Sequence, residues 1–216
     1  MNIHHKARHM MAVGKSGMGK TSYLLKYLSG CSHDRILVFD HQGEIAARLN
    51  ARPEQVAATM EEFLDASEKF RQVFFDPTVH YGGYFPDIFA EFCEVVLDLA
   101  RDHFEPAGME CLFVCDEIQQ FCKIGSVPPS FKAILETGRR ANLDSFCLSQ
   151  RPNKIDSDLR EQWTEIIFFR LDDKNSHKFI EDCGADLDAV VNLPPHHFLF
   201  YQRQRSESRA GNLGFS

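Results

Sequence analysis

The sequence lacks any long apolar run. None of its hydrophobic stretches reaches the roughly 18 residues that a membrane-spanning helix needs. Residues 1–9 are basic but have no apolar core of the kind that a secretion signal carries. We therefore expect neither a signal peptide nor a transmembrane segment, and we interpret residues 1–9 as a loosely held amino-terminal arm.

Paired cysteines are missing as well. The seven cysteines are an odd number, and no two of them form a C-x-x-C pair. This spacing disfavours a zinc site, and several of the cysteines lie in apolar runs, where cysteine behaves as a small hydrophobic residue. We expect a reduced, intracellular protein.

An excess of positive charge is also absent. Lys and Arg number 24 against 31 Asp and Glu, which gives a net charge of −7. That balance excludes a protein that coats nucleic acid with its whole surface, but it allows contact through a few basic loops. The chain of 216 residues has no internal repeats and is long enough for one full core.

A glycine-rich turn follows the first apolar run, at residues 10–13. Gly14, Gly19, Lys20 and Thr21 fill the pattern G-x-x-x-x-G-K-[ST] of a phosphate-binding loop. Glycines let backbone N–H groups curl around phosphates, and a helix starting near Lys20 adds its positive end. Lys20 would reach the β- and γ-phosphates of ATP, and the Thr21 hydroxyl would ligate Mg²⁺. The expected nucleotide-binding set is Gly14, Lys15, Ser16, Gly17, Met18, Gly19, Lys20, Thr21 and Ser22.

A second motif follows a buried strand predicted at residues 111–115. The strand ends in Asp116 and Glu117, where parallel sheets place their ligands. Asp116 would hold Mg²⁺, mostly through water, and Glu117 would orient and polarise the attacking water. This is the Walker B arrangement, and its position after a phosphate loop strengthens the interpretation of both motifs.

Short apolar strands alternate with helical stretches along the chain, which predicts an α/β fold with a mainly parallel central sheet flanked by helices. One domain is expected over residues 10–201, with a fraying tail at 202–216. The predicted strands are at 10–13, 35–39, 72–75, 111–115, 145–149, 165–170 and 196–201. The predicted helices are at 20–28, 53–70, 86–103, 131–142, 156–163, 173–182 and 186–191, with loops at 81–84 and 123–130.

Residues 139–152, Arg-Arg-Ala-Asn-Leu-Asp-Ser-Phe-Cys-Leu-Ser-Gln-Arg-Pro, form a basic turn and a strand ending in Gln-Arg-Pro. This segment resembles motors of the FtsK–HerA superfamily. The turn Asp-His-Gln-Gly-Glu at 40–44 and the order of elements up to Cys-Gly-Ala-Asp at 183–186 are similar to that superfamily too. The resemblance covers residues 10–201, and the short chain resembles the genome-packaging ATPases of tailless, membrane-containing viruses.

The resemblance implies a RecA-like P-loop NTPase of the ASCE type, acting as a homo-oligomeric ring, expected as a hexamer. Such a ring would hydrolyse ATP to translocate double-stranded DNA into a preformed capsid. Portal or membrane-vertex proteins are the implied viral partners, and the host cytoplasm or the virion vertex is the implied location.

The resemblance also implies roles for single residues. Gln150, on a strand expected between those bearing Lys20 and Asp116, would sense the γ-phosphate. Arg139 and Arg140 are candidates for an arginine finger that completes a neighbour's site, although a solvated helix cap is an equal alternative. Arg160 and Arg170 are the reserve candidates. Lys123 and Lys132 flank the loop after Asp116 and Glu117 and would contact DNA phosphates, with a plain surface position as the alternative.

Three other functions remain open. A conjugation or plasmid-transfer motor belongs to the same class of DNA translocase. A P-loop nucleotide kinase or small-molecule phosphotransferase would need an arginine-rich lid and an acceptor pocket, whereas the Asp-Glu pair suits water activation. A regulatory P-loop switch would hydrolyse slowly and form no ring.

Overall fold

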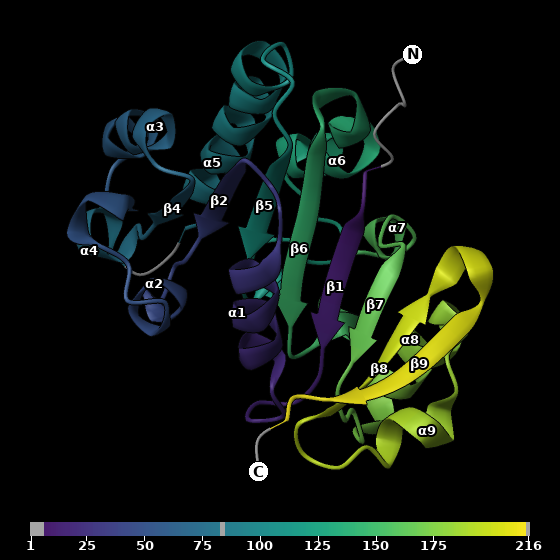
Figure 1. The fold of residues 1–216 in the computed structure, drawn as a ribbon. Helices are drawn as coiled ribbons and strands as arrows, with labels where there is room; N and C mark the ends of the chain where they lie inside the picture. The colour runs from purple at the N-terminus through teal and green to yellow at the C-terminus, as the bar shows by residue number, and fades with distance from the viewer. Residues whose placement is uncertain (1–6, 83–84, 215–216) are drawn as a thin grey trace. The chain divides into compact units, whose positions relative to one another are not determined.

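The computed structural model describes residues 7–82 and 85–214, and Figure 1 shows its ribbon. The chain divides into two compact units. The first unit contains Cys31–Asp116 and Val127–Phe146, together with Ala7. The second contains Arg8–Gly30, Glu117–Ser126 and the chain from Cys147 onward. Strand β6 (Leu143–Ser149) begins in the first unit and ends in the second.

Four parallel strands form the framework of the first unit, in the order β3-β4-β2-β5. Helix α3 packs on β3 and β4, and α6 is linked to α5 by a hydrogen bond from Ser130 Oγ to Ala90 O (2.8 Å). The strands are β2 (Arg35–Phe39), β3 (Val56–Ala57), β4 (Gln72–Phe75) and β5 (Cys111–Cys115). The helices are α2 (Glu44–Arg48), α3 (Met60–Lys69), α4 (Thr78–Tyr81), α5 (Pro86–Leu99) and α6 (Pro129–Thr137).

The second unit has a parallel pair of strands extended by two antiparallel ones. β1 (His9–Val13) pairs in parallel with β7 (Glu165–Phe168), which pairs with β8 (His197–Gln202). β8 then forms a hairpin with β9 (Glu207–Asn212), drawn in yellow in Figure 1. The helices are α1 (Lys20–Gly30), α7 (Ser157–Arg160), α8 (Lys174–Cys183) and α9 (Leu187–Val191).

Phenylalanine rings fill the core of the first unit. Phe75 and Phe92 stack with their centroids 5.5 Å apart, and Phe39 contacts Phe92 edge-on at 5.2 Å. All of β5 is buried, as its continuous apolar run predicts for a strand covered on both faces. The described strands are largely parallel and helices flank them, which confirms the predicted α/β fold.

One predicted helix, at residues 53–70, is wrong in its first half. Pro53–Gln55 form a single 3₁₀ turn, Val56 and Ala57 form β3, and α3 begins only at Met60. The reason is a capping box. The Thr59 hydroxyl accepts from Glu62 N (3.3 Å), and the Glu62 carboxylate accepts from Thr59 N (3.2 Å).

The prediction that the chain frays after Gln202 is also wrong. Arg203–Arg205 form a 3₁₀ turn, and β9 pairs with β8 over its full length. Ser206 makes the reversal in the left-handed region, at φ 51°. β9 is polar and mostly exposed, so it lacks the alternation of apolar and polar residues that marks a half-buried strand.

Other boundaries move by a few residues. α5 ends at Leu99 and is followed by a π-helical turn over Ala100–Phe104. α7 is shorter than predicted, and α6 begins two residues earlier, at Pro129. Of the predicted loop at 81–84, Gly83 and Tyr84 lie outside the described residues.

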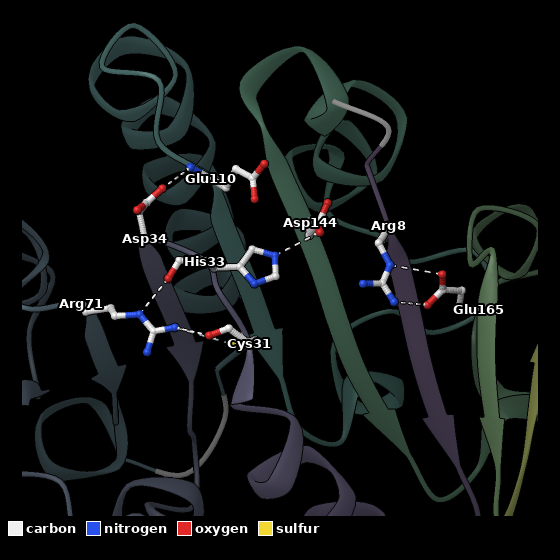
Figure 2. Close-up of polar contacts among 8 residues, drawn as sticks. All are labelled: Arg8, Cys31, His33, Asp34, Arg71, Glu110, Asp144 and Glu165. Atoms are coloured by element: carbon white, nitrogen blue, oxygen red, sulfur yellow. Dashed lines mark hydrogen bonds and ion pairs between the residues drawn. The ribbon is translucent and has the colours of Figure 1, made fainter. Parts of the chain in front are cut away.

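Arg8 and His9 are held more firmly than an amino-terminal arm would be. His9 opens β1 and is buried, and Arg8 donates to both carboxylate oxygens of Glu165, at 3.2 and 2.7 Å (Figure 2). Residues 1–6 lie outside the described part of the chain. Among the described residues, none of the helices is both long enough and apolar enough to span a membrane.

Candidate nucleotide-binding site

The glycine-rich loop joins β1 to α1 and is held by backbone hydrogen bonds within the second unit. Gly14 N donates to Ser149 O (3.2 Å), and Lys15 N donates to Arg170 O (3.1 Å). On the other side of the loop, His196 N donates to Met18 O (3.1 Å). These contacts preorganise the loop backbone before any ligand binds.

Two glycines of the motif are required, Gly14 by close packing and Gly19 by its backbone conformation. A Cβ on Gly14 would lie 2.5 Å from Phe169 Cβ, closer than real Cβ atoms approach. Gly19 has φ +114°, and a Cβ there would lie 2.7 Å from Leu213 Cδ1. Leu213 follows β9, so the carboxyl-terminal hairpin that the sequence did not predict packs against the phosphate-binding motif.

Lys20 begins α1, and its ammonium points back into the loop. The side chain is 6 % exposed, and Nζ donates to Lys15 O at 3.2 Å. Thr21 and Ser22 lie in the first turn of the same helix and are half-buried. A buried cation, backbone amides and the positive end of α1 therefore lie together, which is the composition of a site for phosphate groups.

Lys15 lies at the exposed tip of the loop and forms an ion pair with Asp172. The ammonium of Lys15 holds the pKa of the Asp172 carboxyl below its usual range. The ammonium of Lys15 is therefore bound to Asp172. Lys20 is the loop cation whose side chain points inward.

Glu117 stands in an unusual backbone conformation. It follows β5 and Asp116, adopts φ 50° and ψ 42° in the left-handed region, and is 7 % exposed. Such a conformation costs about 1–3 kcal/mol in a residue other than glycine and is found preferentially at functional sites. Here it directs the carboxylate toward two amide side chains of the second unit.

The two amides come from Gln119 and Gln150. Nε2 of Gln119 donates to Oε2 of Glu117, and Nε2 of Gln150 donates to Oε1. Glu117 and Gln150 were predicted from separate motifs, and the structure brings them into direct contact. Sequence analysis missed Gln119, although its position two residues after the Asp-Glu pair was a usable signal.

Gln119 also presents an unsatisfied acceptor. Its Oε1 atom is buried and has no hydrogen-bond partner in the described residues. A buried amide oxygen without a partner is costly unless water or a ligand supplies a hydrogen. The cluster of Glu117, Gln119 and Gln150 therefore offers both carboxylate and amide oxygens to a water molecule.

The expected Mg²⁺ ligands lie in different units. Thr21 is in the first turn of α1, in the second unit, and Asp116 is the last residue of the first unit before the chain continues into the second. Asp116 follows β5 directly and is 9 % exposed. A hydroxyl and a carboxylate are the hard oxygen donors that Mg²⁺ prefers, so their chemistry fits that ion.

The candidate arginines differ in how they are engaged. Arg139 and Arg140 lie exposed in the 3₁₀ turn Gly138–Ala141, and neither side chain makes a hydrogen bond or ion pair with any described residue. The Arg160 guanidinium donates to Asn153 O and Ile155 O at 2.7–2.9 Å, so it serves its own chain. Arg170 lies 3.7 Å from Asp172.

The two candidate DNA-contacting lysines belong to different units. Lys123 is exposed and follows the 3₁₀ turn Ile118–Gln120. Lys132 is exposed on α6, with its ammonium 3.6 Å from the Glu136 carboxylate one turn later. Glu136 offsets part of the charge of Lys132.

With this geometry in place, the fold can be compared with known proteins. No family model matches the sequence, and no curated protein matches it. Solved structures do match: the genome-packaging NTPase B204 of Sulfolobus turreted icosahedral virus 2 has a TM-score of 0.74 at 18% identity. That match was solved with sulfate and covers 95% of this chain and 96% of B204.

Two further neighbours extend the comparison. The bacterial conjugative coupling protein TrwB has a TM-score of 0.70 at 11% identity, covering all of this chain and 87% of TrwB. The amino-terminal domain of zonular occludens toxin from Neisseria meningitidis has a TM-score of 0.52 at 13% identity, and the match covers 95% of this chain and 94% of the toxin domain. These neighbours are P-loop ATPases of the FtsK–HerA type. The chain therefore has a RecA-like P-loop NTPase fold, as the sequence resemblance implies.

Proposed function

We propose that this protein is a Mg²⁺-dependent ATPase that couples ATP hydrolysis to translocation of double-stranded DNA. The observation that carries the proposal is the pairing of Glu117 with Gln119 and Gln150 in the same unit as an intact phosphate-binding loop. A carboxylate that accepts from two amides is fixed in direction, as a base for water must be.

The chain's residues would act in a defined order. The amides of residues 14–22 bind the phosphates of ATP, and Lys20 offsets charge on the β- and γ-phosphates. Thr21 and Asp116 would hold Mg²⁺, which when bound neutralises charge on the phosphate oxygens. Glu117 then orients a water and takes its proton, while Gln119 and Gln150 keep the carboxylate in place.

Coupling to DNA is proposed through Gln150. Its amide lies at the end of β6, so loss of the γ-phosphate would change its hydrogen bond to Glu117 and the strand behind it. Arg139 or Arg140 would complete the site of the next subunit in a homo-oligomeric ring, expected as a hexamer. Lys123 and Lys132 would contact DNA phosphates without reading bases.

Packaging of a viral genome into a preformed capsid is the role that we propose first. B204 is a genome-packaging NTPase, and the match covers nearly the whole of both chains. Portal or membrane-vertex proteins, at a virion vertex or in the host cytoplasm, would then be its partners. A conjugation motor is the second candidate, because TrwB is a conjugative coupling protein with a TM-score of 0.70.

The test is ATP turnover with and without double-stranded DNA. We expect phosphate release to rise with DNA and the stimulation to fall steeply with salt, without sequence preference. Transfer of the γ-phosphate to a nucleoside monophosphate or another small acceptor would instead establish a kinase. Slow turnover that DNA does not change would favour the regulatory switch.

A further inference from the structure

A second cluster of reactive groups lies in the first unit, apart from the phosphate-binding loop in sequence and not used by the proposed hydrolysis. Four residues form this cluster (Figure 2): Cys31 and His33 in the loop between α1 and β2, Arg71 directly before β4, and Asp144 near the start of β6. Together they form a row of thiol, imidazole and carboxylate with a guanidinium beside the thiol. We propose that Cys31 is a reactive thiolate and the site at which small disulfides modify this protein.

The imidazole of His33 lies between the carboxylate of Asp144 and Cys31 (Figure 2). His33 Nε2 is 3.0 Å from Asp144 Oδ2, and both side chains are almost fully buried. The other ring nitrogen, Nδ1, is buried and has no hydrogen-bond partner of normal geometry in the described residues. The thiol of Cys31 and the His33 side chain interact, and this interaction lowers the pKa of the thiol.

Arg71 contacts both the backbone and the sulfur of Cys31. Its guanidinium donates to Cys31 O (2.5 Å) and to His33 O (2.8 Å), and one of its nitrogens is 3.8 Å from Cys31 Sγ. A guanidinium and an imidazolium beside one sulfur stabilise the thiolate over the thiol. Asp144 acts through His33 and is a positioning residue.

The proton equilibria agree with this geometry. Burial is the largest single influence on His33 and lowers its pKa, but the hydrogen bonds and negative charges of Asp144 and Cys31 together outweigh burial and raise that pKa to about 9. The imidazole is therefore cationic at neutral pH. Burial raises the pKa of the Cys31 thiol, but the hydrogen bond and charge of His33, together with the charge of Arg71, outweigh it and lower that pKa.

Other charged groups near the cluster are occupied elsewhere. The Asp34 carboxylate accepts from Glu110 N (2.9 Å), as Figure 2 shows. The Arg35 guanidinium donates to Ser67 O and Asp34 O, and it lies over the ring of Phe104. The groups that act on the sulfur are therefore His33 and Arg71.

Access distinguishes Cys31 from the other six cysteines. Cys31 is half-buried, whereas all of the others are buried. Burial raises the pKa of Cys111 to about 12 and also raises the pKa values of Cys122, Cys147 and Cys183. A reagent in solution should therefore find a single reactive thiol in the folded protein.

The reaction is thiol–disulfide exchange. Cys31 releases its proton to solvent, and its sulfur attacks one sulfur of a small disulfide. A new S–S bond joins Cys31 to that half of the reagent while the old S–S bond breaks. The other half leaves as a thiolate and carries away the electron pair, so Cys31 is oxidised and the reagent is reduced.

The experiment titrates the full-length protein with 5,5′-dithiobis(2-nitrobenzoate) and, separately, with uncharged iodoacetamide across a range of pH. We expect one thiol per chain to react fast, and this fast reaction to be lost in Cys31→Ser. The pH at which the reaction rate is half-maximal, the pH midpoint, should lie below that of free cysteine in the same buffer. A fast equivalent that survives Cys31→Ser, or a midpoint at or above that of free cysteine, overturns the proposal.

Variants of Arg71 test the electrostatic cause and keep both side chains of the buried His33–Asp144 pair. Arg71 is exposed, so Arg71→Gln should fold, raise the midpoint and slow iodoacetamide at neutral pH by at least about threefold. Arg71→Lys should keep part of the lowering of the pH midpoint, because lysine keeps the positive charge. Arg48→Gln, an exposed arginine of the same unit paired with Glu44, is the matched control and should change nothing. An unchanged midpoint in Arg71→Gln contradicts the proposal.

Discussion

The Nε2 amide of Gln150 donates a hydrogen bond to Oε1 of Glu117. The residue proposed to sense the γ-phosphate is thus in direct contact with the residue proposed to activate water. An amide that donates to this carboxylate cannot donate the same hydrogen to a phosphate oxygen, so the contact can differ between nucleotide states. Bound phosphate can in this way be linked to the orientation of the base.

This relationship predicts the behaviour of Gln150 variants. Gln150→Ala leaves Glu117 with one amide donor, so turnover should fall by about 10- to 100-fold while ATP affinity stays within about twofold. Phosphate release and nucleotide binding, measured on the same preparations, check this. Gln120→Ala, at an exposed position of the same turn as Gln119, is the control. Wild-type turnover in Gln150→Ala would exclude the proposed sensor.

Lys20→Ala should abolish most ATP turnover and leave the fold intact. The ammonium is the inward cation of a loop whose backbone is held by other contacts, so we expect a loss of at least about 10²-fold. Lys26→Ala, an exposed lysine on the same helix, should retain turnover. Circular dichroism and phosphate release on both variants decide the outcome, and full activity in Lys20→Ala would refute the phosphate-loop assignment.

The arginine finger can be tested by mixing inactive proteins. If Arg139 or Arg140 acts in trans, the double alanine variant should keep its nucleotide affinity and lose roughly 10³-fold in turnover. Adding Lys20→Ala subunits, which carry the finger, should restore part of the activity at mixed junctions. Full turnover in the double variant would shift attention to Arg170, because Arg160 is bound to its own chain.

The pair of His33 and Asp144 predicts how stability depends on pH. The pKa of His33 is raised from 6.5 to about 9, so its contribution is complete below 6.5 and is lost as pH rises through 9. The contribution of His33 to the free energy of unfolding should therefore fall across that window, and this fall should be absent in His33→Gln. Breaking the pair should itself cost about 3 kcal/mol. Urea unfolding at several pH values tests both, and an unchanged pH dependence in His33→Gln would contradict the assignment.

Patterns with strong local chemistry were predicted well from the sequence. The apolar run at 111–115 and the strand Arg35–Phe39 have the predicted bounds, because fully buried strands are continuous in sequence. The wrong predictions lie where strand pairing or specific hydrogen bonds determine the secondary structure. β9 is polar and is a strand only because β8 lies beside it. The capping box at Thr59 starts α3 at Met60, whereas composition alone extended the predicted helix back to Pro53.

Some residues of the candidate site could likewise be predicted from the sequence, and others could not. The two sequence motifs predicted roles for Lys20 and Glu117, because the chemistry of each role requires fixed spacing, and these roles stay predictions. The position of Gln119 after the Asp-Glu pair was a signal, but its contact with Glu117 depends on the left-handed turn at Glu117. Leu213 gave no such signal, because its contact with Gly19 depends on the carboxyl-terminal hairpin. The thiolate cluster at Cys31 was also invisible, because its four members are scattered along the sequence.

The most direct test of the account is Glu117→Gln, with ATP binding and phosphate release measured on the same full-length protein. An amide cannot take a proton from water, so we expect ATP affinity within about twofold of wild type and turnover reduced by at least about 10²-fold. Glu161→Gln, an exposed glutamate of the same unit, should match wild type in both. Normal turnover in Glu117→Gln would contradict the central claim that Glu117 activates water for ATP hydrolysis.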